Sequence, residues 1–327
     1  MDRDAVDEVV RRGDLDELVR TVDALCDARE WDQLEQLRER CARAHEVGHQ
    51  LWPAASHAAY RLALEAPALW AAAVLVDDSA PFALGPLPEV AAQAHTWVEL
   101  APHVSSGPAA VLAAHERVLR GENLSDVDLP GPAVLEVPLV LSTWEPEYAL
   151  AEYASDRAEF PMPSLPRLTK TEVPTPSPKI ERDEVCGALV DLTRAWVEGS
   201  NGESDAVVVE GRSTDAITAL GATDVRTASI GSPDAMALMA WAGASGGAHG
   251  RRPGAAAGRF AAWWAAGALT DLLDEWPPDP LVLGERLDAL SFFVWSSKGR
   301  DTGWWLRLAI EDAGQGRSWA VAASDAD

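Results

Sequence analysis

Apolar residues in the first half of the chain recur at the three- and four-residue spacing of helices that bury one face. The pattern predicts helices over residues 15–28, 31–52, 53–66, 68–76, 89–100 and 108–119. Pro53 stands where proline is tolerated, at the first turn of a helix. Short helices joined by tight turns bury their faces against neighbouring helices, so we expect an all-α helical-array domain over residues 1–157.

A proline-rich segment follows the predicted array. Residues 158–181 contain six prolines, at positions 161, 163, 166, 174, 176 and 178. Each proline removes a backbone donor and restricts φ, which disfavours both helix and sheet. We therefore predict that residues 158–181 form an extended connector between two domains.

Beyond the connector, strand-like and helical patterns alternate. Runs rich in β-branched residues at 206–209 and 225–230 lie among helical patterns at 183–197, 214–220, 232–241 and 253–274. Three strand-like runs then close the chain at 290–296, 304–311 and 319–323, joined by loops rich in Gly and polar residues. The alternation predicts an α/β domain over residues 182–327, with a mixed sheet that ends in a strand meander.

Small residues recur every fourth position in the last long helical pattern, at Gly254, Gly258, Ala262 and Ala266. A ridge of small side chains lets a second backbone approach closely. We expect this helix to be the central helix of the second domain.

Charge and composition narrow the class of protein. The chain has 27 Lys and Arg against 52 Asp and Glu, a formal charge of −25, which disfavours nucleic acid and anionic membranes as partners. The first ten residues are acidic and polar, unlike a secretory signal, and the apolar run at 66–76 is too short to cross a bilayer. Cys26, Cys41 and Cys186 have no C-x-x-C spacing, so we expect reduced, buried thiols in a cytoplasmic protein.

The letters H-E-V-G-H at 45–49 are the most specific chemical signal. In the predicted helix, His45 and His49 would share a face beside Glu46, the arrangement with which zinc hydrolases hold the metal and activate its water. The string resembles the zincin signature over these five residues. His45 and His49 would be ligands, Glu46 the general base, and His57 on the next helix the candidate third ligand. The alternative is that both histidines pack at the edge of an apolar stripe. Beyond zinc at this motif, no cofactor is expected.

Residues 243–254, here called the Gly/Arg loop, form the second candidate site. Glycines allow a backbone to approach a ligand closely, and amides at the start of the following helix attract anions. If the two hairpin loops converge on it, a small anion would find a cationic pocket in an acidic protein. The candidate ligand-binding residues are Gly246, Gly247, His249, Arg251, Arg252, Lys298, Arg300 and Arg317. The alternative is a solvated loop without a ligand. The letters G-x-S-x-G at 243–247 do not indicate a nucleophile elbow, because a helical pattern precedes them rather than a strand.

Tryptophan is over-represented, with 14 Trp against 3 Tyr and 5 Phe. Trp304 and Trp305 are adjacent in a predicted strand and must point to opposite faces of the sheet. An exposed tryptophan is a candidate anchor for a protein partner or for a second copy of the chain.

These patterns favour binding over catalysis. Helical arrays present long surfaces to other proteins, and the chain offers no complete catalytic set. We expect a two-domain protein that acts as a scaffold or binding protein for a protein partner. A zinc-dependent hydrolase that uses residues 45–49 and a small-anion sensor that uses the Gly/Arg loop are the two alternatives.

Overall fold

The computed structural model describes residues 3–76, 80–174, 179–297 and 303–326, with the backbone alone at 3–6, 45 and 47. The chain forms two compact units, Met1–Leu135 with Ala151–Phe160 and Glu136–Leu150 with Pro161–Asp327. Helices and antiparallel sheet both contribute, so the predicted combination of α and β structure is confirmed. Among the described residues we find no helix with the length and apolar character that a bilayer crossing requires.

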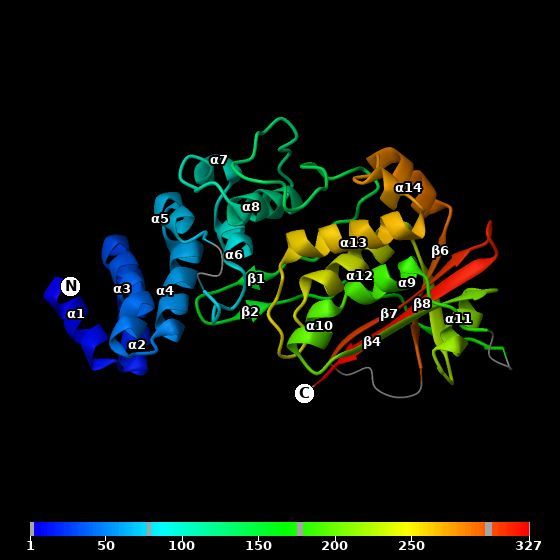
Figure 1. Ribbon diagram of the computed structural model, residues 1–327, viewed down its shortest axis with the longest axis horizontal. Coiled ribbons are helices and arrows are strands. Elements are labelled where there is room, and N and C mark those ends of the chain that lie inside the picture. The colour runs from blue at the N-terminus through cyan, green and yellow to red at the C-terminus, as the bar shows by residue number, and fades with distance from the viewer. Residues whose placement is uncertain (1–2, 77–79, 175–178, 298–302, 327) are drawn as a thin grey trace. The chain divides into compact units, whose positions relative to one another are not determined.

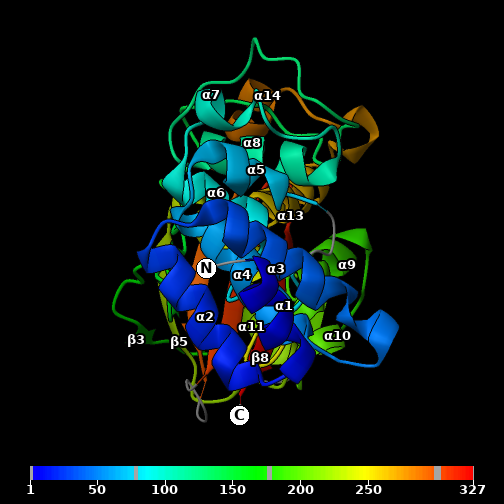
Figure 2. The ribbon, with the colours of Figure 1, turned by 90° about the vertical axis from the view of Figure 1, so that its left-hand side faces the viewer.

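Unit 1 is built mainly of short helices that pack against their neighbours in the chain (Figures 1 and 2). The elements are α1 (Arg3–Arg12), α2 (Leu15–Asp27), α3 (Trp31–Arg43), the 3-10 turn η1 (Ala44–Val47), α4 (Trp52–Glu65), α5 (Ala68–Ala73), α6 (Leu87–Ala94), α7 (Trp97–Leu100), α8 (Pro108–Leu119), and the strands β1 (Glu152–Tyr153) and β2 (Ala158–Glu159). Leu18, Val22, Leu34 and Leu37 are fully buried, which is why the apolar spacing predicted helices that begin at residues 15 and 31.

Unit 2 contains a six-stranded sheet and helices on both of its faces. The elements are β3 (Thr169–Lys170), α9 (Glu184–Asp191), α10 (Arg194–Gly199), β4 (Glu203–Glu210), α11 (Ser213–Ala219), β5 (Arg226–Ile230), α12 (Ser232–Ala244), α13 (Ala255–Leu269), the 3-10 turn η2 (Leu273–Glu275), α14 (Pro280–Asp288), β6 (Ser291–Ser296), β7 (Trp304–Asp312) and β8 (Arg317–Asp325).

The strand order is β3-β5-β6-β7-β8-β4, and every pairing is antiparallel. The predicted closing meander is present as β6, β7 and β8. Strands β4 and β5 run in the same direction, as the connection through α11 predicts. The meander lies between them, so no parallel pair forms and the sheet is antiparallel rather than mixed.

The two faces of the sheet are covered unequally. Helices α9 and α12 pack on one face with α13 behind them, and α11 packs on the other (Figure 1). Alternation along β7 sends Leu306 and Leu308 to the α12 face, where both are fully buried. Trp304 stacks on Trp241 of α12, with ring centroids 5.3 Å apart, whereas Trp305 lies near Arg307 on the face of α11. The prediction that these two tryptophans point to opposite faces is therefore confirmed.

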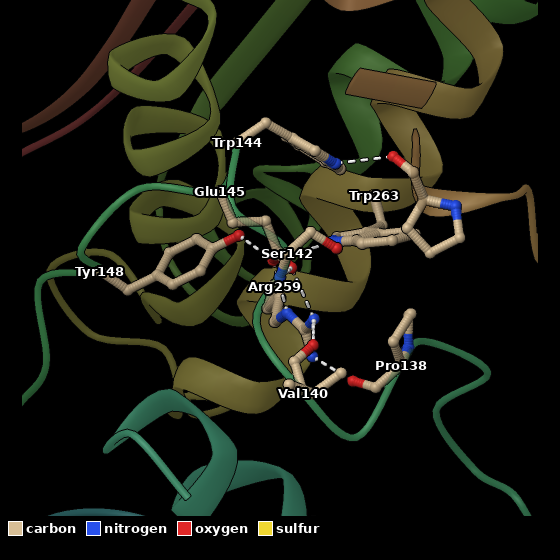
Figure 3. A network of polar contacts seen from close by, with 9 residues as sticks. Pro138, Val140, Ser142, Trp144, Glu145, Tyr148, Arg259 and Trp263 are labelled. Carbon is tan, nitrogen blue, oxygen red and sulfur yellow. Dashed lines mark hydrogen bonds and ion pairs between the residues drawn. The ribbon is translucent and has the colours of Figure 1, made fainter. Parts of the chain in front are cut away.

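A buried ion pair fixes residues 136–150 to α13 within unit 2 (Figure 3). The Glu145 carboxylate accepts bonds from Arg259 Nε (2.7 Å) and Nη2 (2.8 Å), and the side chains of both residues are almost completely buried. The same carboxylate accepts bonds from the Tyr148 hydroxyl (2.7 Å), Trp263 Nε1 (3.0 Å) and the Ser142 amide (2.9 Å). We call Glu145, Tyr148, Arg259 and Trp263 the carboxylate clamp.

The clamp also binds the backbone of residues 136–150. Arg259 donates to the carbonyl oxygens of Pro138 (2.7 Å) and Val140 (3.1 Å). Burial alone would raise the pKa of Glu145, but the hydrogen bonds and charge of Arg259 outweigh it and hold that pKa below its usual value. Arg259 uses four of its five N–H donors in these bonds, and the Glu145 carboxylate accepts five, so we regard the clamp as a structural element.

The three cysteines are free and buried, as expected from their spacing. Desolvation raises the pKa of Cys26, Cys41 and Cys186 to about 12. We expect none of the three thiols to react with iodoacetamide at pH 8 in the native protein, and all three to react in urea, as counted by intact-protein mass spectrometry. A native thiol that reacts as fast as a small-molecule thiol would contradict this burial.

Candidate functional site

The zinc motif does not lie on a continuous helix. The predicted helix 31–52 is wrong beyond Arg43, because α3 ends there and residues 44–47 form the 3-10 turn η1. Gly48 then adopts a φ of +89°, a left-handed conformation that stops the helical path. His45 and His49 are thus not one α-helical turn apart, which the zincin arrangement requires.

The other residues of the motif have separate surroundings. Glu46 is exposed, and the side chain of His45 lies outside the described residues. His49 is half-buried and its amide donates to the Ala44 carbonyl (3.0 Å). His57 Nε2 lies 3.3 Å from Asp23 Oδ1. Within the described ranges, no three side chains of His, Cys, Asp or Glu are grouped as a metal site would need.

The Gly/Arg loop is held by contacts within unit 2. The Ala248 amide donates to the buried carboxylate of Asp325 (2.6 Å), and Gly247 packs against the same carboxylate with a φ of +72°. The His249 amide donates to Ser200 Oγ (3.1 Å), and a Cβ at Gly246 would lie 2.1 Å from the Gly250 carbonyl. The carboxylate of Asp325 thus already binds an amide within this loop.

The predicted cations do not all gather at this loop. Arg317 begins β8 and bonds to Asp183 (3.3 Å), whereas the Gly/Arg loop contacts Asp325 at the other end of the same strand. A nine-residue strand separates its ends by roughly 26 Å. Arg251 and Arg252 have contacts of their own, and Lys298 and Arg300 lie outside the described residues.

A different site is built on the face of the sheet that α11 covers in part. Cross-strand pairing aligns two rows of side chains there. The first row contains Asp205, Ala322 and Arg307, and the second contains Glu203, Ser324 and Trp305. Ala322 and Ser324, on the middle strand β8, have short side chains, so the sheet is hollow between the longer side chains of β4 and β7.

A cavity of about 400 Å³ lies over these rows. Leu220 and Gly221, at the end of α11, close one side of it, and Trp295 and Ser297 of the β6 side contribute another wall. We call this cavity the sheet pocket, and its principal residues are Glu203, Asp205, Leu220, Gly221, Trp295, Ser297, Arg307, Ala322 and Ser324.

The sheet pocket has a cationic, aromatic side. The guanidinium carbon of Arg307 lies 5.7 Å from the centre of the Trp295 ring and 5.8 Å from that of Trp305. These are cation–π distances, which orient the guanidinium plane. Trp295 is only 2% exposed, and its indole Nε1 is buried without a hydrogen-bond partner in the described part of the chain. A buried donor without an acceptor is costly, although the Nε1 atom itself is closed off from the cavity.

Two further cavities of unit 2 lack this feature. One, of about 350 Å³, is bordered by Glu285, Arg286 and Asp312, and the other, of about 380 Å³, by Phe260 and Trp264. Among the described residues that line them, none has a buried polar side-chain atom without a partner. The sheet pocket therefore combines a cavity, a cation and an unsatisfied buried donor where the other two do not.

Two local features of the sequence point to this pocket, although the helical and strand patterns by themselves do not reveal it. Arg307 interrupts an apolar strand two residues after Trp305, so both must lie on one face. Ala320, Ala322 and Ser324 alternate along β8 and leave that face without bulky side chains. The partnership of Arg307 with Trp295 depends on strand register, which the letters alone do not determine.

A protein family described as "Family of unknown function (DUF6183)" matches residues 16–327. No curated protein and no solved structure matches the chain.

Proposed function

The chain belongs to this family of unknown function, and from the sheet pocket we propose that it is a binding protein that holds a small ligand with an anionic group. The observation that carries the proposal is the Arg307 guanidinium, in cation–π contact with Trp295 and Trp305, at the wall of a 400 Å³ cavity. Cavities of this size suit metabolites, and a few polar groups on apolar walls give them orientation and specificity.

The charges of the pocket favour a carboxylate as the anionic group. A guanidinium presents paired N–H donors in its own plane and binds carboxylates through two parallel hydrogen bonds. The cation–π contacts of Arg307 limit the orientations of that plane. The scaffold role and the zinc-dependent hydrolase stay predictions, and neither has an arrangement of described residues in its favour comparable to the pocket.

We expect Arg307→Gln to abolish ligand-induced stabilisation. A ligand at one hundred times its Kd stabilises the native state by about 2.7 kcal/mol, which corresponds to a rise in Tm of roughly 5–10 °C for a unit of this size. The measurement is the Tm of the full chain in a panel of small carboxylates and amino acids at millimolar concentration. Arg307→Gln should remove the rise that the best compound produces.

The matched control is Arg194→Gln, which removes a surface arginine that pairs with Asp191 away from the pocket. It should keep the full rise in Tm. A panel in which no compound raises Tm, or a rise that survives Arg307→Gln, would contradict the proposed function.

A further inference from the structure

Beyond its cationic side, the sheet pocket has an anionic side. Glu203 and Asp205 line it from the edge strand β4, two strands away from Arg307 on β7. Neighbouring strands are about 4.8 Å apart, so the backbones that carry the opposite charges are separated by roughly 10 Å. The short side chains of Ala322 and Ser324 lie between them. The pocket is therefore a trough with one cation on one side and two carboxylates on the other.

The two carboxylates differ in their partners. Asp205 is already paired, because Arg182 Nη2 lies 2.9 Å and 3.0 Å from its two oxygens. Glu203 is exposed and has no ion-pair partner among the residues described. A cationic group that enters the trough would find in Glu203 a carboxylate that no internal cation neutralises.

Resting on the proposed function, we propose that the ligand of the sheet pocket is a zwitterion, with its carboxylate at Arg307 and an ammonium group at Glu203. Each end then meets the opposite charge. The net charge of the protein supports the same class of ligand. A formal charge of −25 repels a dianion at long range, whereas a zwitterion carries no net charge and is not repelled.

Isothermal titration of the full chain with two matched series of compounds tests this ligand class. One series is the ω-amino acids from glycine to 6-aminohexanoate, and the other is the unsubstituted carboxylates of equal length, from acetate to hexanoate. We expect one ω-amino acid to bind best, because its length matches the trough, and to bind at least tenfold more tightly than its unsubstituted counterpart.

Two substitutions separate the two ends of the ligand. Glu203→Gln should lower the affinity of the best ω-amino acid to that of its unsubstituted counterpart and leave the affinity of the unsubstituted acid unchanged or slightly higher. Arg307→Gln should weaken both series. Glu210→Gln, at the other end of β4 and outside the pocket, should change neither.

The outcomes distinguish the ligand class from the binding function. If the unsubstituted carboxylates bind as tightly as the ω-amino acids and Glu203→Gln has no effect, the zwitterion is wrong while the anion-binding function stands. If neither series binds, or if Arg307→Gln leaves both affinities unchanged, both proposals fail.

Discussion

Replacing Arg259 by methionine is expected to lower the free energy of unfolding of unit 2 by about 3–5 kcal/mol. The substitution leaves the Glu145 carboxylate buried with hydrogen bonds but without its cation. It also removes the hydrogen bonds that Arg259 donates to the carbonyl oxygens of Pro138 and Val140. Uncompensated buried charge is among the most destabilising changes that a single substitution can make. Urea denaturation followed by tryptophan fluorescence measures the loss.

The double variant Glu145→Leu with Arg259→Met separates the cost of the unpaired charge from the value of the pair. Without either charge, the part of the loss that comes from the unpaired carboxylate should return, whereas the Tyr148 hydroxyl, the Trp263 Nε1 and the Pro138 and Val140 carbonyls still lack their partners. Arg182→Met is the surface control. It breaks an exposed pair with Asp205 and should cost less than about 1 kcal/mol. A loss for Arg259→Met as small as that of the control would show that the clamp contributes little.

The clamp could not be located from the sequence because 114 residues separate its two charges. One local signal was present. Arg259 is the only charged residue within the segment 255–269, which is otherwise apolar or small on all sides. A helix that is apolar all round is buried, so a single charge within it must find a buried partner. Which of the 52 acidic residues is that partner depends on the tertiary fold.

Helix boundaries were predictable where proline or a break in the apolar spacing defines them. Residues 108–119 form α8 as predicted, with Pro108 in its first turn, and α4 likewise contains Pro53 and ends before Pro67. The predicted helix 89–100 instead divides into α6 and α7. At the start of α7 the Thr96 amide (2.9 Å) and hydroxyl (2.7 Å) both donate to Glu99 Oε2, a local contact that apolar spacing does not reveal.

The candidate sites show the same difference between features set by neighbouring residues and features set by the tertiary fold. Because Trp304 and Trp305 are consecutive residues of a strand, the sequence predicted that they occupy opposite faces, since alternation is a local property of any strand. The sheet pocket instead depends on the register of β4, β7 and β8, which brings Asp205 opposite Ala322 and Arg307. Register follows from packing and turn geometry, so a site made of cross-strand neighbours becomes visible only in the folded sheet.

The second large effect is expected from Gly258→Ala, which should destabilise unit 2 by about 3 kcal/mol, at the upper end of the range for overpacked cores. Of the predicted ridge, Gly254 precedes α13 with a φ of +104°, and Gly258 lies inside the helix against α12. A Cβ at Gly258 would lie 2.2 Å from the Ala240 carbonyl oxygen and 2.7 Å from the Ala244 amide nitrogen. Both contacts are with backbone, so the two helices would have to separate.

Gly187→Ala in α9 is the matched control for this substitution, and it should have the opposite sign. Gly187 is an exposed residue within a helix, and beyond its chain neighbours and the adjacent backbone of its own helix no atom lies within 4 Å of an added Cβ. Alanine there loses less backbone entropy on folding than glycine, so we expect stabilisation by about 0.5–1 kcal/mol. Urea denaturation of both variants tests the pair, and a Gly258→Ala protein as stable as the parent would mean that α12 and α13 pack less closely than the structure shows. Opposite changes in the free energy of unfolding would show that the two glycines have different roles in unit 2. An added methyl group forces α12 and α13 apart at position 258, whereas at position 187 it only restricts the unfolded backbone.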